Sequence, residues 1–122
     1  MHTVLRITGD LAGARVAAAS INAVSDGAMS PRARGDGFVA SISDADTWSE
    51  HVRALAAFVA AHREALVAAS EAGLSLDADT MVEADDVAGR PITSLVCPPH
   101  LLRELGAVGA SLTVSWYETR AT

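Results

Sequence analysis

Two spacings of hydrophobic residues alternate along the chain. In four short runs an apolar residue stands at every second position, which is the period of a β-strand with one buried face. These runs are Thr3–Thr8, Phe38–Ser43, Leu74–Ala84 and Ser111–Tyr117. In two longer segments, Leu11–Val24 and Thr47–Gly73, the spacing is typical of amphipathic helices. A brief third helix over His100–Leu105 is predicted by Pro99 at its start and Gly106 after its end. The predicted order is β-α-β-α-β-α-β.

The longest periodic segment, Thr47–Gly73, carries both start and stop signals of a helix. Thr47 and Glu50 have the spacing of a capping box, and Gly73 suits the left-handed residue that follows a helix. The apolar stripe consists of Trp48, Val52, Leu55, Val59, His62, Leu66 and Ala69, with Phe58 at its edge. A helix of this length measures about 37 Å, whereas a domain of this size has a radius of gyration of about 14 Å. We therefore expect the helix to span the domain or to bend near Ala60–Arg63.

Each predicted strand has one apolar and one polar side, so the sheet has one covered and one open face. We predict an α+β fold: a two-layer sandwich with helices packed on one face of a four- or five-stranded, mainly antiparallel or mixed sheet. The 122 residues suit a single domain, residues 1–122. The glycine, proline, serine and aspartate content of Ser25–Gly37 predicts a loop. The apolar run Ile92–Val96 fits either a helix or a strand.

The open face of the sheet is the predicted binding surface, because its polar side chains need no place in the core. Its candidate residues are Arg6, Ser41, Asp77, Asp79, Ser115 and Tyr117. Arg6 is the main cation of this set, and Asp77 and Asp79 are its candidate ion-pair partners. We predict that this surface binds a protein partner or a second copy of the chain, as in a homodimer.

The composition argues against several classes of protein. The formal net charge is −6, whereas binding to nucleic acid or to an anionic membrane needs a basic surface. The single cysteine excludes an internal disulfide. The N-terminal residues lack a signal pattern and no apolar run reaches the ~20 residues that span a bilayer, so we expect a cytoplasmic protein. Aromatic residues make up only 4%, which predicts a core of small aliphatic side chains around a few large anchors. These anchors are Phe38, Trp48, Phe58 and Trp116.

Three features admit a chemical interpretation beside a structural one. His62 interrupts the apolar stripe, either as a site histidine or as a half-buried one that reaches a carbonyl or water, and we favour the second. Cys97 stands just before the short helix and three residues before His100, where a helix N-terminus lowers a thiol pKa. It lacks a third, orienting group. Arg32 and Arg34 lie in a glycine-containing loop, where they can hold a phosphate or carboxylate or remain solvated.

An acidic run invites a calcium-binding interpretation. It comprises Asp77, Asp79, Glu83, Asp85 and Asp86. The run lacks the spacing and the central glycine of an EF-hand loop. Carboxylates along one side of a strand also protect a sheet edge from aggregation. We therefore predict neither a metal ion nor a cofactor.

Both ends of the chain resemble a known family. The opening reads Arg6-Ile7-Thr8-Gly9-Asp10-Leu11, and the ending runs from Leu101–Ala107 through Leu112–Tyr117. They are similar to an uncharacterised bacterial family, catalogued as a domain of unknown function, whose members open with a strand leading into Ile-Ser-Gly-Asp and a leucine. The family's Gly-Leu-x-Pro-Thr segment is absent here, and Phe38 stands where the family has a tryptophan. The resemblance implies a fold without a known activity, so no site residue is transferred.

These features predict a non-enzymatic interaction module. One version is an immunity-type or regulatory protein whose acidic surface neutralises a basic partner, in line with the net charge of −6 and the acidic run. The alternative is a small enzyme or ligand sensor that uses His62, Cys97, His100 or the Arg32/Arg34 loop. That alternative requires at least two of these side chains to meet in one pocket.

Overall fold

The computed structural model describes residues 1–83 and 94–117 of the chain. Its strands are β1 (His2–Thr8), β2 (Met29–Pro31), β3 (Gly37–Ser43), β4 (Ser75–Glu83) and β5 (Ala110–Tyr117). Its helices are α1 (Leu11–Val24), α2 (Trp48–Ala61), α3 (Arg63–Glu71) and α4 (Pro99–Val108). Three features of the sequence prediction lie wholly or partly outside the described residues: the strand end at Ala84, the acidic residues Asp85 and Asp86, and the start of the run Ile92–Val96.

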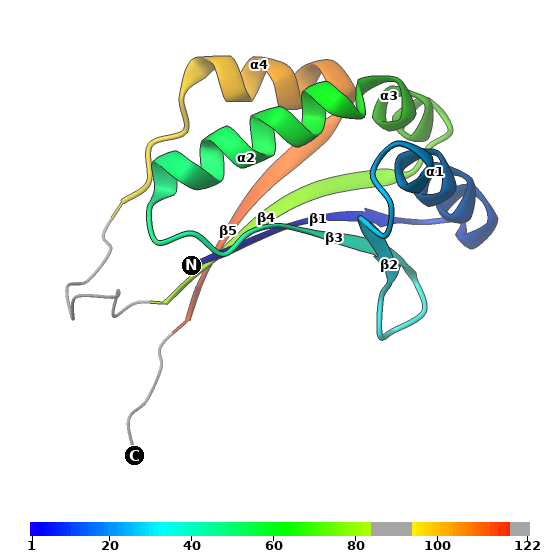
Figure 1. Cartoon of the computed structure of the whole chain (residues 1–122), viewed down its shortest axis with the longest axis horizontal. Helices are drawn as coiled ribbons and strands as arrows, with labels where there is room; N and C mark the ends of the chain where they lie inside the picture. Colours follow the sequence, from blue (N-terminus) through cyan, green and yellow to red (C-terminus); the bar gives the residue numbers. More distant parts are fainter. Residues whose placement is uncertain (84–93, 118–122) are drawn as a thin grey trace.

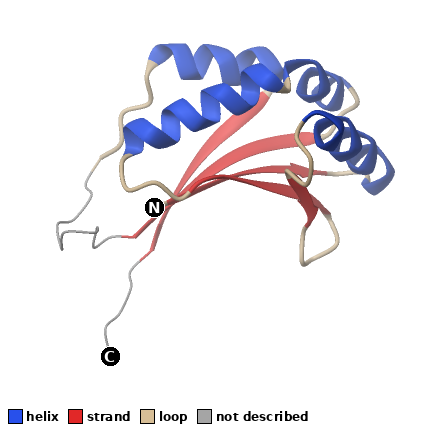
Figure 2. Cartoon of the chain, viewed as in Figure 1, coloured by secondary structure: helices blue, strands red, loops and turns tan. Residues whose placement is uncertain are grey.

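The five strands form one mixed sheet in the order β2-β3-β1-β4-β5. Neighbouring strands are antiparallel except for β4 and β5, which are parallel. The parallel pair needs a crossover, and α4 lies in that connection. All helices of the described part lie over one face of the sheet, and the opposite face is open (Figures 1 and 2). The predicted α+β architecture, with helices on one face of a mixed sheet, is therefore confirmed.

The core lies between the sheet and the helix layer. Leu5 of β1 stands opposite Ala40 of β3 and Ala78 of β4, and all three are buried. The helices contribute further buried side chains to the same cluster: Ile21, Leu55, Val59, Leu66, Leu101 and Leu105. Small aliphatic residues thus fill most of the core, as expected.

The expected aromatic anchors behave in two ways. Phe38, Trp48 and Phe58 are half-buried and pack against the core cluster. Trp116, by contrast, is 45% exposed, so its prediction as a core anchor was wrong. The alternation along its strand assigned it correctly to the helix side, but β5 lies at the edge of the sheet, where a side chain has neighbours on one flank only.

The predicted loop Ser25–Gly37 contains a strand, β2, which corrects the sequence prediction. The Asn22 side chain holds it in place: its Oδ1 accepts from the Met29 backbone N–H at 2.8 Å, and its Nδ2 donates to the Met29 carbonyl at 3.1 Å. Met29 is buried opposite Ala40 of β3. A strand of three residues is too short for its alternation to be read from the sequence.

The long predicted helix is divided at His62, within the expected bend region Ala60–Arg63. α2 ends at Ala61, and α3 begins at Arg63. The Thr47 half of the predicted capping box is confirmed at the start, where the Thr47 hydroxyl accepts from the Glu50 N–H at 3.3 Å. The change of direction lets α3 contact both α1 and α4 while α2 contacts β3 (Figure 1).

The end of α4 differs from its prediction. Gly106 does not end the helix, which continues for two further residues to Val108. The left-handed residue is Gly109, with a φ of 75°. The extra turn buries Val108, which is 1% exposed. The predicted end at Gly106 was therefore wrong, because continuing the helix buries the apolar Val108 side chain.

None of the helices in residues 1–83 and 94–117 is long and apolar enough to cross a membrane.

Gly37 fixes where the β2–β3 hairpin meets β1. Its φ is 155°, and a Cβ atom added to it would collide with the backbone carbonyl oxygen of Ile7. We expect Gly37→Ala to lower the free energy of unfolding by about 3 kcal/mol or more, because backbone must move to relieve the overlap.

The matched control for this prediction is Gly35→Ala in the same hairpin. Gly35 also has a positive φ, 71°, but an added Cβ would meet nothing within 4 Å. Its expected cost is therefore only the conformational one, about 1 kcal/mol. Urea unfolding followed by circular dichroism measures both variants, and equal losses would contradict the role assigned to the close approach.

Candidate functional site

A polar network crosses the open face of the sheet from β1 to β5. The Arg6 guanidinium donates to Asp79 at 2.7 Å, and its Nη1 lies 3.8 Å from a carboxylate oxygen of Asp77. On the other side of β4, the hydroxyls of Ser111 and Thr113 both donate to Oδ1 of Asp77, at 2.8 and 2.9 Å. The Ser115 hydroxyl donates to Oδ1 of Asp79 at 3.0 Å. Three strands are thereby joined through two carboxylates.

The register explains why these side chains meet. Arg6 of β1 stands directly opposite Asp77 of β4, and Asp77 stands opposite Ser111 of β5. Side chains on one face of a sheet contact both their direct and their diagonal neighbours, so Arg6 reaches Asp79 as well. Asp79 is only 6% exposed, which makes its pairing with Arg6 a requirement of the fold.

The six predicted binding residues divide into two groups. Arg6, Asp77, Asp79 and Ser115 are brought together in the network, and Arg6 pairs with both aspartates as expected. Ser41 is exposed on β3 opposite Val4, at the margin of the face. The sixth residue, Tyr117, lies at the far end of β5.

Tyr117 contacts Glu83 rather than the central network. Its hydroxyl donates to a carboxylate oxygen of Glu83 at 3.4 Å. Desolvation, the negative charge of Glu83 and this hydrogen bond together raise the pKa of Tyr117 above its usual value, so the hydroxyl stays protonated at neutral pH. Ser111 and Thr113 were missing from the predicted set. The two-residue period of β5 places both on the same face as Ser115 and was the signal that could have found them.

The acidic run does not assemble a metal site within the described residues. No group of three or more histidine, cysteine, aspartate or glutamate side chains there could hold a metal ion. Asp77 and Asp79 instead accept hydrogen bonds from Arg6 and from the hydroxyls of β5.

The two edges of the sheet differ in how they are protected. β2 has three residues and ends at Pro31, which cannot donate a backbone hydrogen bond. β5 has eight residues, with neither a charge nor a proline, and within the described part of the chain it pairs only with β4. Trp116 and Tyr117 near its end are 45% and 43% exposed. Within residues 1–83 and 94–117, β5 thus lacks the usual protective features of an edge strand.

A leucine of α4 adds to this edge. Leu102 is 53% exposed. His100 of the same helix lines a pocket with Val52 and Arg53 of α2, so its side of α4 faces α2. Successive helix residues are about 100° apart around the axis, so Leu102 lies about 200° from His100. Leu102 therefore lies on the flank of α4 turned away from α2. We call β5, with its side chains Trp116 and Tyr117, together with Leu102 the β5 edge.

The Arg32/Arg34 loop lies beside the open face. Figure 1 shows the β2–β3 hairpin projecting on the side of the sheet opposite the helices. Its two arginines and Arg6 line a hollow of about 300 Å³ over Val4 and Val39. Arg32 is paired with Asp36 at 3.1 Å, and Arg6 with Asp79. The hollow can receive a carboxylate or phosphate, but the charges of two of its arginines are already offset.

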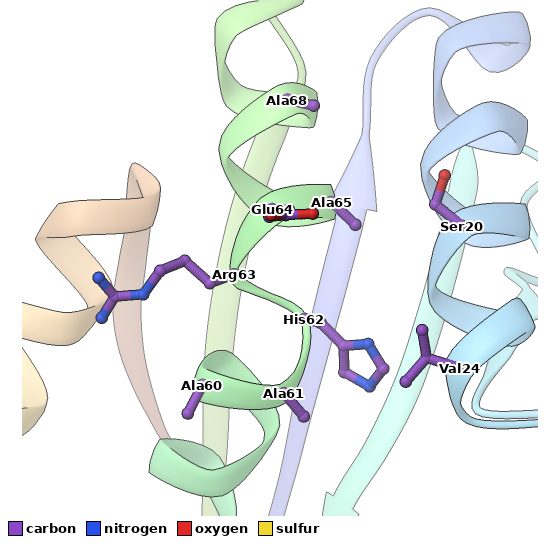
Figure 3. Close-up of a pocket in the computed structure, with 9 residues that line it drawn as sticks. All are labelled: Ser20, Val24, Ala60, Ala61, His62, Arg63, Glu64, Ala65 and Ala68. Atoms are coloured by element: carbon purple, nitrogen blue, oxygen red, sulfur yellow. The ribbon is translucent and has the colours of Figure 1, made fainter.

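His62 lies in a pocket of about 530 Å³ between the α2–α3 junction and α1 (Figure 3). Its Nε2 is 3.0 Å from the Ser25 hydroxyl, and its ring packs on Phe58 with centroids 4.5 Å apart. The residue is 4% exposed, and burial lowers its pKa. It is more deeply buried than expected, and its partner is a hydroxyl rather than a carbonyl or water.

No hydrogen bond between described residues joins Cys97 to His100. Burial raises the pKa of the Cys97 thiol, the opposite of what a nucleophile needs. Its Sγ donates weakly to the Pro98 carbonyl, at 3.9 Å. His100 lines a pocket of about 480 Å³ with Trp48 and other residues of α2.

A histidine that the sequence did not single out is the most deeply buried one. His51 is 0% exposed. Its Nε2 lies 2.7 Å from the Ala45 carbonyl, which can only accept, so this nitrogen carries a hydrogen. With a neutral ring, Nδ1 accepts from the Thr3 hydroxyl at 2.8 Å, and Thr3 in turn accepts from Thr80 at 2.8 Å. This closed network is structural.

Comparison with models of known protein families, with curated proteins and with solved structures found no match to this chain. The resemblance to the family with the Ile-Ser-Gly-Asp opening therefore stays a prediction.

Removing Arg6 tests the network. We expect Arg6→Met to lower the free energy of unfolding by about 3 kcal/mol or more, because the buried Asp79 carboxylate loses its cation. The double variant Arg6→Met/Asp79→Leu should recover much of this loss, since the buried carboxylate is removed and Asp77, which stays, is partly exposed. Urea unfolding, which leaves ion pairs unscreened, measures both.

Arg32→Met is the matched control for Arg6. Its partner Asp36 has a side chain that is 50% exposed, so the expected loss is below about 1 kcal/mol. If Arg6→Met costs no more than Arg32→Met, the network does not organise the open face.

The lowered pKa of His62 predicts a dependence of stability on pH. The unfolded chain takes up a proton at this residue at a higher pH than the folded chain does. Stability from this group is therefore complete above the ordinary histidine pKa of about 6.5 and falls as the pH drops below it. We expect His62→Gln to reduce the difference between urea midpoints measured at about pH 7.5 and about pH 5.5. An unchanged difference would exclude His62 as its source.

Proposed function

We propose that this chain is a non-enzymatic protein-interaction module that binds an extended segment of another polypeptide along the β5 edge. The observation that carries the proposal is the unprotected character of β5, an eight-residue strand without charge or proline. A strand of this kind presents backbone donors and acceptors to which a further strand adds. Such backbone pairing supplies affinity, and the flanking side chains supply specificity.

The exposed side chains at this edge support the same proposal. Trp116 and Tyr117 are the residue types most often found at the energetic centre of protein interfaces. Both lie at one end of β5, and Leu102 extends the apolar surface onto α4. An aromatic ring gains more from burial at an interface than from partial exposure to water.

The open face contributes to this function as a support. Its carboxylates hold the hydroxyls of Ser111, Thr113 and Ser115, so β5 is held in its register from the open side. The immunity-type version of the proposal keeps its basis in the net charge of −6. Asp77 and Asp79 add little to that version, because both already accept hydrogen bonds from within the chain.

The alternative, a small enzyme or ligand sensor, has less support. His62, His100 and the two loop arginines line three different pockets. Among the described residues, no hydrogen bond joins any two members of the set His62, Cys97, His100, Arg32 and Arg34. Arg32 and Arg34 share one of these pockets, but none of His62, Cys97 and His100 lines it with them. A cytoplasmic location belongs to the leading proposal and rests on the sequence alone.

Placing a charge at the β5 edge tests the proposal. Trp116→Lys is expected to reduce recovery of the partner about tenfold or more, because strand addition would have to desolvate the new ammonium group. The measurement is affinity capture from the native host with quantitative mass spectrometry. The matched control, Val24→Lys, changes a 70% exposed side chain on α1, away from this edge, and should retain the partner. If Trp116→Lys retains the same proteins as the unmodified chain, the proposed function is wrong.

A further inference from the structure

We propose that the polypeptide that pairs with the β5 edge is β5 of a second copy of this chain. This inference rests on the proposed function and names its partner. The two strands run antiparallel about a two-fold axis at Val114, so that two five-stranded sheets become one continuous sheet. A two-fold axis is the symmetry of most dimers, and it requires a surface that is complementary to itself.

The charge distribution favours self-pairing at this edge. Each copy carries a formal net charge of −6, so two copies repel each other over most of their surface. β5 has no charged side chain. The carboxylates beside its open face are Asp77, Asp79 and Glu83. The two aspartates accept from the hydroxyls of β5 and from Arg6, and Glu83 accepts from Tyr117. Two β5 strands can therefore approach without bringing like charges into direct contact.

The order of side chains along β5 favours one register. In a continuous sheet, helix-side residues of one copy must stand opposite helix-side residues of the other. Successive residues point to opposite faces, so the two-fold axis must relate a residue to its own copy rather than to the copy of its neighbour. With Val114 on the axis, Leu112 stands opposite Trp116 of the second copy. On the open face, Ser111 stands opposite Tyr117 of the second copy. Each large aromatic side chain then meets a smaller one, and the symmetry repeats both pairs.

The helix layer extends the contact beyond the backbone. Leu112 and Val114 are each only partly buried in the single chain, and Trp116 is 45% exposed. A second copy of β5 would cover all three. Leu102 lies on the flank of α4 turned away from α2, so the two copies of α4 approach across the axis with Leu102 between them. An interface of one strand pair and one helix flank lies at the small end for specific complexes, and we expect a dimer that dissociates on dilution.

A cysteine scan tests both the partner and the register. Opposed residues in antiparallel strands have Cα atoms about 4.5–5.5 Å apart, within the range that a disulfide bridges. A cysteine on the two-fold axis therefore links to itself. In the 122-residue chain with Cys97→Ser, which removes its only thiol, we expect Val114→Cys to form a covalent dimer under mild oxidation. Thr113→Cys should link much more slowly, because it stands opposite Ser115 of the second copy.

The control for random collision is Ser30→Cys on β2, the other edge of the sheet, where Ser30 is exposed. Light scattering of the unmodified chain at several concentrations should show a mass that rises from 12.6 kDa towards twice that value. Trp116→Lys should raise the dimer dissociation constant about tenfold or more. Circular dichroism verifies that each variant is folded.

The outcomes separate this inference from the proposed function. A monomer at all concentrations, together with Val114→Cys linking no faster than Ser30→Cys, overturns the second copy as partner. Faster linking at Thr113 than at Val114 overturns the register. The proposed function falls only if Trp116→Lys leaves capture from the native host unchanged, and that result is independent of the oligomeric state.

Discussion

The ion pair between Arg6 and Asp79 is the constraint on which the sheet depends. It joins the central strand β1 to β4 at 2.7 Å, with the aspartate almost fully buried. A slip of β1 by one residue would turn Arg6 into the core and Leu5 onto the open face. The apolar core on one side and the ion pair on the other therefore require the same register. Hydroxyls of β5 extend this arrangement to the edge through the same carboxylates.

A second polar network serves the helix side. His51 of α2 is bonded to Thr3 of β1 and to the Ala45 carbonyl in the loop before the helix. Buried polar groups stabilise a fold only when every partner is present, and here each ring nitrogen has one. The network ties the start of α2 to the sheet. His62 instead ties the α2–α3 junction to the end of α1, through its hydrogen bond with Ser25. Both histidines thus position helices, which explains the deep burial of each without a catalytic role.

The difference between the two sheet edges links this architecture to function. At one edge a short strand ends in proline and is held by Asn22. At the other, a long neutral strand is held in register from within but carries exposed aromatic side chains. A protein that binds a strand at one edge of its sheet needs that edge open and the other edge protected. The same rigid support lowers the conformational entropy lost on binding, because β5 is already extended.

The sequence alone determined which residues share a face. Local periodicity defined the two long helical segments and four of the five strands, and it placed Arg6 on the same face as Asp77 and Asp79. Residue types at helix ends defined the Thr47 cap and the start of α4. Only the tertiary structure decided that Met29–Pro31 is a strand, that Gly109 rather than Gly106 ends α4, and that β5 lies at an edge. Each of these depends on a partner outside the element itself: Ala40 for β2, the core for Val108, and β4 for β5. Alternation records which way a side chain points but not which strand lies beside it, so strand order, and with it the exposed edge, is a property of the packed chain.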